Sequence, residues 1–175
     1  MVVRLDAGRD AVRAYVQEHA SRGLRHVRSL IADDNNKLFT LIGDLSEEES
    51  RAVTSANEWS VFETLRHLSA SLDRGKTRLE VLSSGQPYVS PPMTAGQMGD
   101  VEYASFDELR RACEAVIAAI DVVLERADPA RGLELTAEHI AFGPFNWLEW
   151  AVYSHHVHIH DHIGQIEAIC GQLRA

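Results

Sequence analysis

The chain has 175 residues, and its 26 acidic side chains outnumber its 17 basic ones, so that the formal net charge is −9. This balance argues against a protein that binds nucleic-acid phosphates or docks on an anionic membrane, because both functions need a basic face. The length is that of one domain, and 45% apolar with 25% charged residues is typical of a soluble globular protein. We therefore expect a single domain over residues 1–175.

The first elements are predicted to be helices. Residues 8–21 have apolar side chains on one side, and Gly23 interrupts that pattern. From residue 24 to 45, apolar residues recur at spacings of three, four and seven, as they do on one face of a helix. The sequence leaves open whether these segments form one bent helix or two. A short polar turn is expected at residues 46–50.

The next helix has a clear start signal. Ser60 and Glu63 form the sequence of a capping box, in which the hydroxyl and the carboxylate each satisfy a free backbone N–H of the first turn. We expect this helix to continue to about residue 84, where Gly85 permits a left-handed stop. Residues 85–104 are rich in Gly and Pro and predict a long loop, which is uncommon unless the loop has a function.

The second half of the chain predicts two more helices. Ser105 and Glu108 form a second capping-box sequence, and the helix that they open should end at Asp128-Pro129. Residues 146–149 resemble a third capped start, of a helix that extends to about Leu173. No convincing strand is predicted. The expected fold is all-α, an up-down four-helix bundle with one long crossover at residues 85–104.

The two cysteines and the chain start bear on the compartment. Cys113 and Cys170 fall in different predicted helices and form no CxxC motif, so we expect small buried core residues in a reducing environment. No apolar run approaches the roughly 20 residues that cross a bilayer, and residues 1–6 lack the apolar stretch of a signal peptide. The sequence predicts a cytoplasmic protein.

Five of the nine histidines fall within residues 155–162. Histidine is the commonest metal-ligating side chain, and residues four apart share one face of a helix. Two pairs have this spacing: His156 with His160, and His158 with His162. The face of the second pair continues through small and apolar residues, whereas that of the first continues through more polar positions. Periodicity therefore favours His158 and His162 as the inward pair and an outward, hydrated position for His156 and His160.

A metal site needs a further ligand, and His67 is the best candidate because it lies inside the predicted helix that follows Ser60. Catalytic zinc-type sites commonly have three protein ligands and one open position. The alternative for His67 is a core residue bonded to a backbone carbonyl, and the alternative for the whole cluster is a solvated, histidine-rich helix face. His19, His26 and His139 are expected at the surface.

Two stretches resemble a known family. Residues 58–68, EWSVFETLRHL, resemble the W-S-x-x-E-x-L-x-H-L signature of DinB-like proteins. Residues 142–150, FGPFNWLEW, followed by His158, His162 and residues 163–166, resemble the closing helix of that family. The order of the helices also matches. The resemblance covers about residues 20–172, so that residues 1–20 form an N-terminal extension outside it.

The resemblance implies a four-helix bundle that binds a divalent metal through three histidines, one from the second helix and two from the fourth. Carried over to this chain, these ligands are His67, His158 and His162. The additional His155, His156 and His160 depart from the family pattern and could supply alternative ligands. Zn or Ni is the expected ion, with Fe, Co or Mn as alternatives, because three imidazoles suit several of these metals.

The function implied by the resemblance is that of a metal-dependent enzyme. Relatives include transferases and isomerases that use low-molecular-weight thiols such as mycothiol or bacillithiol, and hydrolases of small molecules. We therefore expect a thiol-dependent S-transferase or isomerase that acts on a small electrophile through a metal-activated nucleophile, and that forms a homodimer. The alternatives are a metal-dependent hydrolase, a metal-binding or stress-response protein without catalysis, and a helical protein whose histidines sense pH.

Few other residues predict a catalytic role. Glu63 lies one turn before His67 and could orient or assist the site, although its capping duty is an equal explanation. Asp161 projects about 100° away from its neighbour His162 on the helix and is a poor general base. The candidate lids are the loop 85–104 and the connection 136–146; the loop offers apolar contacts from Tyr88, Met93 and Met98 and a hydrogen bond from Tyr103.

Overall fold

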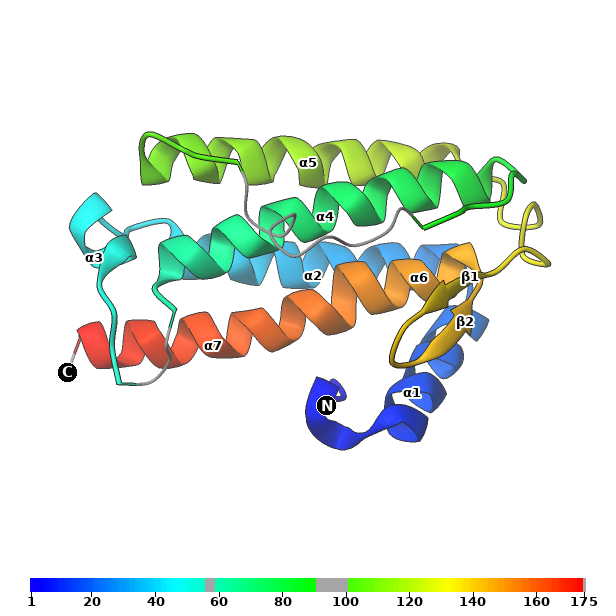
Figure 1. The fold of residues 1–175 in the computed structure, drawn as a ribbon, viewed down its shortest axis with the longest axis horizontal. Coiled ribbons are helices and arrows are strands. Elements are labelled where there is room, and N and C mark those ends of the chain that lie inside the picture. Colours follow the sequence, from blue (N-terminus) through cyan, green and yellow to red (C-terminus); the bar gives the residue numbers. More distant parts are fainter. Residues whose placement is uncertain (56–58, 91–100, 175) are drawn as a thin grey trace.

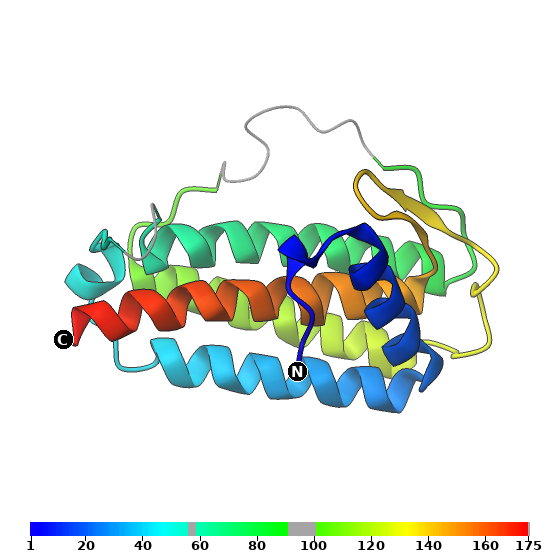
Figure 2. The ribbon, with the colours of Figure 1, turned by 90° about the horizontal axis from the view of Figure 1, so that it is seen from below.

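Four long helical segments lie side by side in the protein, whose computed structural model describes residues 1–55, 59–90 and 101–174 (Figures 1 and 2). They are α2 (Leu24–Ile42), α4 (Val61–Ser83), α5 (Phe106–Arg126), and α6 (Trp147–Val152) continued by α7 (His158–Leu173). α4 packs against α5 and against α6 and α7, and α2 packs against α7 and α5. The prediction of a mainly α-helical fold is confirmed.

The direction of the helices accounts for the long connection between residues 84 and 105. α4 and α5 both run from the end where α3 (Glu47–Arg51) lies toward the end where β1 (Ala137–His139) lies (Figure 1). A link between two parallel neighbours has to return along the helix length, which is about 30 Å for a helix of some 20 residues. Met93 and Met98, the expected apolar contacts of this loop, lie outside the described residues.

The N-terminal segment forms two separate helices and not one bent helix. α1 (Arg9–Ser21) and α2 are two helices, and α1 packs across α6 near the hairpin rather than continuing the line of α2 (Figure 2). Gly23 between them has a φ of +86°, which side-chain-bearing L-residues rarely adopt. The glycine therefore permits the sharp change of direction. A short 3-10 turn, Leu5–Ala7, precedes α1.

Of the three predicted capped starts, those at Ser60 and at residues 146–149 are confirmed as capping boxes, and the one at Ser105 is half confirmed. At the start of α4, the backbone N–H of Ser60 donates to the Glu63 carboxylate at 2.8 Å, and the N–H of Glu63 donates to the Ser60 hydroxyl at 3.2 Å. At the start of α5, Ser105 accepts from the N–H of Glu108, but the Glu108 carboxylate accepts from the N–H of Ala104 instead of that of Ser105.

Two short elements correct the predictions. Residues 46–50 are not a simple turn, because Ser46 caps the short helix α3 with its own capping box. β1 and β2 (Gly143–Phe145) form an antiparallel hairpin in which Ala137 pairs with Phe145, where no strand was predicted. Three residues are too few for a recognisable alternation pattern. The indole N–H of Trp150 donates to the carbonyl of Ala137 at 3.1 Å and so ties the hairpin to α6.

The last helix is interrupted, whereas an unbroken helix was predicted. A π-helical turn, Tyr153–Val157, lies between α6 and α7. At this turn the ring of His155 is fully buried against Gly75 of α4; a Cβ on that glycine would come within 2.7 Å of the His155 Cε1 atom. The missing side chain at position 75 therefore makes room for the imidazole. Wide turns of this kind are frequent at functional sites.

The core lies between the long helices and consists of aliphatic and aromatic side chains from all of them. Cys113 and Cys170 are free and buried within it, as predicted. Among the described helices, none combines the length and the apolar character that a membrane crossing requires.

Candidate metal centre

Three histidines from two helices converge at one point between α4 and α7. His67 extends from α4, and His158 and His162 extend from α7, one helical turn apart. One ligand nitrogen of each can be chosen so that all three atoms lie within 4.8 Å of one another. The ring centroid of His67 is 5.6 Å from that of His158 and 5.0 Å from that of His162. The structure thus brings together the three residues that the sequence nominated.

The distances fit a shared ion. The Nε2 atoms of His158 and His162 are 3.1 Å apart. Imidazole–metal bonds of about 2.0–2.1 Å at angles of 90–110° separate neighbouring nitrogens by roughly 3.0–3.4 Å. The same distance suits a hydrogen bond, in which the Nε2–H of His158 donates to the unprotonated Nε2 of His162. A cation placed beside both nitrogens would take the place of that proton and be stabilised by both lone pairs. The ligation itself stays a prediction.

Burial keeps these imidazoles neutral. It lowers the pKa of His67 to about 4, with the nearby His162 and Arg74 adding to the effect. It lowers the pKa of His158 to about 3, again with help from the neighbouring histidines, and it lowers the pKa of His162 as well. A metal binds the unprotonated ring nitrogen. At neutral pH all three side chains are therefore in the form that can bind an ion.

Gln165 sets the orientation of one ring. The Nδ1 atom of His162 lies 2.7 Å from the amide oxygen of Gln165, so Nδ1 carries the proton and donates. Its Nε2 atom is then the unprotonated one, and it faces His158. Ligating histidines usually donate their second N–H to an oxygen in this way, which fixes both tautomer and ring orientation.

Within the described residues, the group that could hold an ion contains these three histidines and no carboxylate or thiol. Glu63, the carboxylate that the sequence placed one turn before His67, accepts hydrogen bonds from both the backbone N–H and the hydroxyl of Ser60. Its observed contacts are those of a helix cap. A three-histidine group leaves at least one coordination position for a substrate or water.

The other four-apart pair is not a hydrated helix face, and that prediction was wrong for His156. This side chain is only 2% exposed, because Tyr15 of α1 and Asp34 of α2 lie against its ring. Its Nδ1 lies 2.5 Å from one oxygen of the buried Asp34, and the Nδ1 of His160 lies 3.0 Å from the other oxygen. The hydroxyl of Tyr15 is 2.8 Å from the Nε2 of His156. His160 remains about one third exposed.

His155, which could have supplied an alternative ligand, and His139, which was expected at the surface, both lie elsewhere. Burial and the nearby charge of Arg78 lower the pKa of His155 to about 3, and its ring lies against Gly75 outside the three-histidine group. His139, expected at the surface, is half-buried, and its Nδ1 accepts from the backbone N–H groups of Ala141 and Phe142. Its Nε2 therefore carries the proton.

A cleft of about 490 Å³ leads to the three-histidine group, which is a volume suited to a small molecule. His67 and His158 line one part of it; its other walls come from α4, α6, the π-helical turn, the hairpin and the start of the crossover. The lining residues beyond the two histidines are Ser71, Arg74, Gly75, Arg78, Tyr88, Ser90, Glu138, His139, Ile140, Trp150, Tyr153 and Ser154.

Several cleft residues were missed by sequence reasoning. Arg74 and Arg78 follow His67 at spacings of seven and eleven, which places all three on one face of α4. That spacing was a readable signal. Trp150 and Tyr153 gave no such signal, because their position depends on the π-helical turn and on the hairpin.

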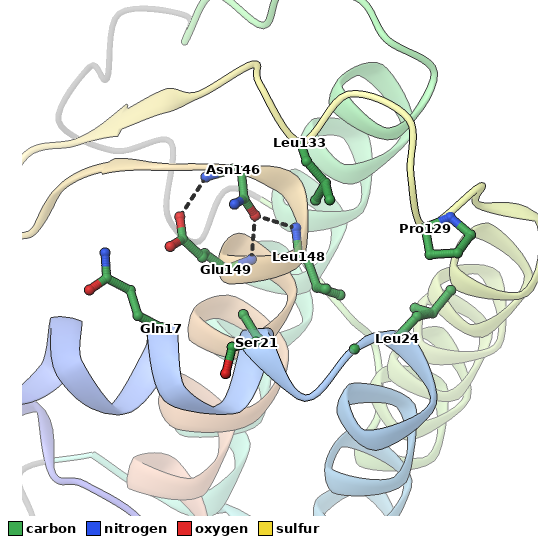
Figure 3. A pocket seen from close by; sticks show the side chains of 10 residues that line it. Gln17, Ser21, Leu24, Pro129, Leu133, Asn146, Leu148 and Glu149 are labelled. Atoms are coloured by element: carbon green, nitrogen blue, oxygen red, sulfur yellow. Dashed lines mark hydrogen bonds between the residues drawn. The ribbon is translucent and has the colours of Figure 1, made fainter.

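A second pocket, of about 350 Å³, lies where α1 and α2 meet the start of α6 (Figure 3). Two of its polar side chains are already bonded within the pocket: the Asn146 side chain accepts from the N–H groups of Leu148 and Glu149, and the Glu149 carboxylate accepts from the N–H of Asn146. The remaining walls include Leu24, Pro129 and Leu133. These bonds are helix-capping bonds, so the pocket offers little to a polar ligand.

The sequence of the chain also matches a known protein family. Residues 30–166 match the model of the DinB superfamily, and the chain belongs to that superfamily. The match includes all three converging histidines and leaves α1 outside. Neither the curated proteins nor the solved structures gave a match.

Proposed function

We propose that this member of the DinB superfamily is a divalent-metal-dependent enzyme that uses His67, His158 and His162 as ligands and activates a low-molecular-weight thiol for transfer to, or isomerisation of, a small electrophile. One observation carries the proposal: three neutral imidazoles converge where a cleft of substrate size reaches them. A purely structural zinc site would be closed by a fourth protein ligand.

The chemistry divides between the ion and the protein. A divalent ion held there would lower the pKa of a thiol or a water molecule and so supply a nucleophile at neutral pH. The three histidines would hold it, and Gln165 fixes the tautomer of His162. In the same cleft, burial raises the pKa of Tyr153 to about 12, so its hydroxyl is protonated. With the Nε2–H of His139, it offers hydrogen-bond donors to the electrophile.

The rival activities share this site. With water as the nucleophile it would serve a hydrolase, and without a productive substrate it would only bind metal. Zn or Ni remains the proposed ion, because three imidazoles and an open position suit both, as they suit Co or Fe. The three readings differ in whether a thiol is consumed and whether product forms at all.

The test uses the full chain with its metal content measured by mass spectrometry. Purified protein is incubated with mycothiol, bacillithiol or glutathione and a chromogenic electrophile, and the loss of free thiol is followed. We expect thiol conjugation that stops on chelation, returns when Zn or Ni is added, and is absent in His158→Ala. His160→Ala is the matched control and should retain activity.

The alternatives give distinct results. Metal-dependent product formation without thiol consumption would indicate the hydrolase. Metal binding without turnover of any tested electrophile would favour the non-catalytic reading. Circular dichroism of the chelated protein decides the role of the ion: helicity should stay nearly intact, and cooperative unfolding on chelation would show a structural ion and remove the basis of the proposal.

A further inference from the structure

One face of α4 connects the three-histidine group to a pair of guanidinium groups. His67, Arg74 and Arg78 all line the same cleft. The charge of Arg74 contributes to the lowered pKa of His67 and His158, and that of Arg78 to the lowered pKa of His139. The cleft therefore has a positively charged wall in a chain whose net charge is −9. Its one lining carboxylate, Glu138, is exposed to solvent.

Arg78 is held in a fixed orientation by aromatic rings. Its guanidinium carbon lies 3.6 Å from the centroid of the Trp150 ring and 5.3 Å from that of the Tyr88 ring. Stacking of this kind stabilises the cation and leaves the edge of the planar group exposed to a ligand. One donor of the guanidinium is hydrogen-bonded to the Tyr88 side chain, which helps to fix its orientation, and the others can bind a ligand. A pre-oriented fork loses less rotational freedom on binding than a mobile side chain would.

The charge of Arg78 lacks an acidic partner in the described part of the chain. No carboxylate is among the groups that influence its pKa, which burial lowers. Its Nε is buried and has no hydrogen-bond partner. A partly buried cation is usually paired with an anion. An acidic group from a ligand would supply that pairing.

The distance from this guanidinium to the histidines can be bridged by one small molecule. The Tyr153 ring lies between the two regions: its centroid is 6.5 Å from that of His158 and 5.7 Å from that of Trp150. Trp150, Tyr153 and Ile140 give the intervening wall an apolar surface. A ligand with an acidic end, an apolar middle and a reactive far end would match this order of groups.

We propose that Arg78 binds the carboxylate of a small organic acid, whose reactive end lies beside His67 and His158. This proposal rests on the proposed function for the reactive end, but the carboxylate subsite can be tested without it. A single planar carboxylate fits one stacked guanidinium through two parallel hydrogen bonds. The subsite thus selects a monoanionic carboxylate over a neutral amide or ester of the same shape.

The probes are acetate, phenylacetate and 4-phenylbutyrate, each compared with its uncharged amide, and phenyl phosphate as a different anion. Binding is measured by calorimetry and by ligand-observed NMR, on the full chain as purified and after chelation of metal. Chelation removes direct binding of carboxylate to an ion. We expect the aryl carboxylates to bind both forms at least tenfold more tightly than their amides.

Variants identify the residue. Arg78→Met keeps the aliphatic stem and should lower carboxylate affinity by about tenfold to a hundredfold, as loss of a charged hydrogen bond does, with amide affinity unchanged. Arg78→Lys keeps the charge but not the fork and should lie in between. Arg25→Met, on the exposed side of α2, is the matched control and should bind as wild type. Should Arg78→Met fail to fold, the comparison rests on Arg78→Lys.

The outcomes separate this proposal from the previous one. Equal carboxylate affinity in wild type and both Arg78 variants, or no carboxylate binding up to the solubility of the probes, overturns the subsite. Binding of phenyl phosphate but not of the carboxylates overturns the chemical class. Arg78-dependent carboxylate binding to a protein that takes up neither Zn nor Ni when they are supplied would keep the subsite while the enzyme proposal fails. If the wild type shows no preference for carboxylates while Arg78→Met has normal metal content, the carboxylate subsite fails and the enzyme proposal is unaffected.

Discussion

Two pairs of histidines on the last helix have the same spacing and different surroundings. His158 and His162 face each other with their Nε2 atoms 3.1 Å apart, and a third imidazole, His67, lies beside them. His156 and His160 instead each place Nδ1 against one oxygen of Asp34. The ring nitrogens of the first group contact no carboxylate, whereas the rings of the second group have the buried carboxylate of Asp34 between them.

This difference shows that the role of a histidine pair depends on the group that its rings contact, and not on the spacing of the two residues. A carboxylate accepts the N–H of each ring and so satisfies both the acid and the imidazoles inside the protein. Where no acid is present, two ring nitrogens at ligand distance can both bind a cation. The pair at 156 and 160 therefore fastens α7 to α2, and the pair at 158 and 162 is available to bind an ion.

The largest effect should come from removing a proposed ligand. His162→Ala or His158→Ala is expected to lower metal affinity by more than about a hundredfold, because a lost ligand should cost more than a lost supporting bond. Metal content after equilibration in a metal buffer measures it. His160→Ala is the control and should retain metal; equal loss in His160→Ala and His158→Ala would show that the wrong pair was chosen.

Acid should weaken the metal-free protein through its neutral imidazoles. The pKa is lowered to about 4 in His67 and to about 3 in His155 and His158, against about 6.5 in the unfolded chain. Between pH 6.5 and 4 the unfolded chain binds protons that the folded chain does not. The contribution of these imidazoles to the free energy of unfolding should therefore fall as the pH falls through this window, and change no further below about pH 3.

Urea unfolding of the chelated protein at several pH values measures this slope. His155→Gln removes one titrating group without adding a charge, so its free energy of unfolding should depend less steeply on pH. An identical slope in His155→Gln and wild type would show that the buried imidazole at 155 does not drive the acid response.

The pair His156 and His160, which contacts Asp34, should contribute to stability and not to metal binding. His156→Ala leaves one buried oxygen of Asp34 and the hydroxyl of Tyr15 without this partner and opens a cavity, so it should lower the free energy of unfolding by about 2–4 kcal/mol. Metal content should stay near that of wild type. A change below about 0.5 kcal/mol, the range of ordinary surface substitutions, would mean that the pair does not hold the helices together.

A smaller effect is expected at Gln165, which orients His162. Gln165→Ala should weaken metal binding by about tenfold, or about 1.4 kcal/mol, as loss of a supporting hydrogen bond does at other metal sites. Gln165→Glu keeps an acceptor and should bind metal at least as well as wild type. Gln172→Ala, on the same helix but bonded to Ser55, is the control. Affinity unchanged in Gln165→Ala would remove this residue from the site.

Four of the sequence predictions stay predictions. The thiol, the identity of the metal, the homodimer and the cytoplasmic location all depend on molecules or surroundings outside a single folded chain. Light scattering over a wide protein concentration range tests the dimer, since a constant mass near 19.5 kDa would contradict it.

The sequence by itself determined the local features of this protein. The helices, the cap at Ser60 and the stop after α4 follow from interactions between residues a few positions apart, which a sequence displays directly. The nomination of His67, His158 and His162 came from resemblance to a family, because periodicity alone only weakly separated the two pairs.

Only the tertiary structure decided which groups meet across long separations. Asp34 contacts His156 although the two lie 122 residues apart in the sequence, and no local sequence pattern predicts that a carboxylate of another helix lies there. The hairpin that carries His139, the π-helical turn that fits His155 against Gly75, and the stacking of Arg78 on Trp150 likewise depend on packing between distant segments. Burial, partner and protonation are properties of that packing, and they separate a metal ligand from a structural histidine.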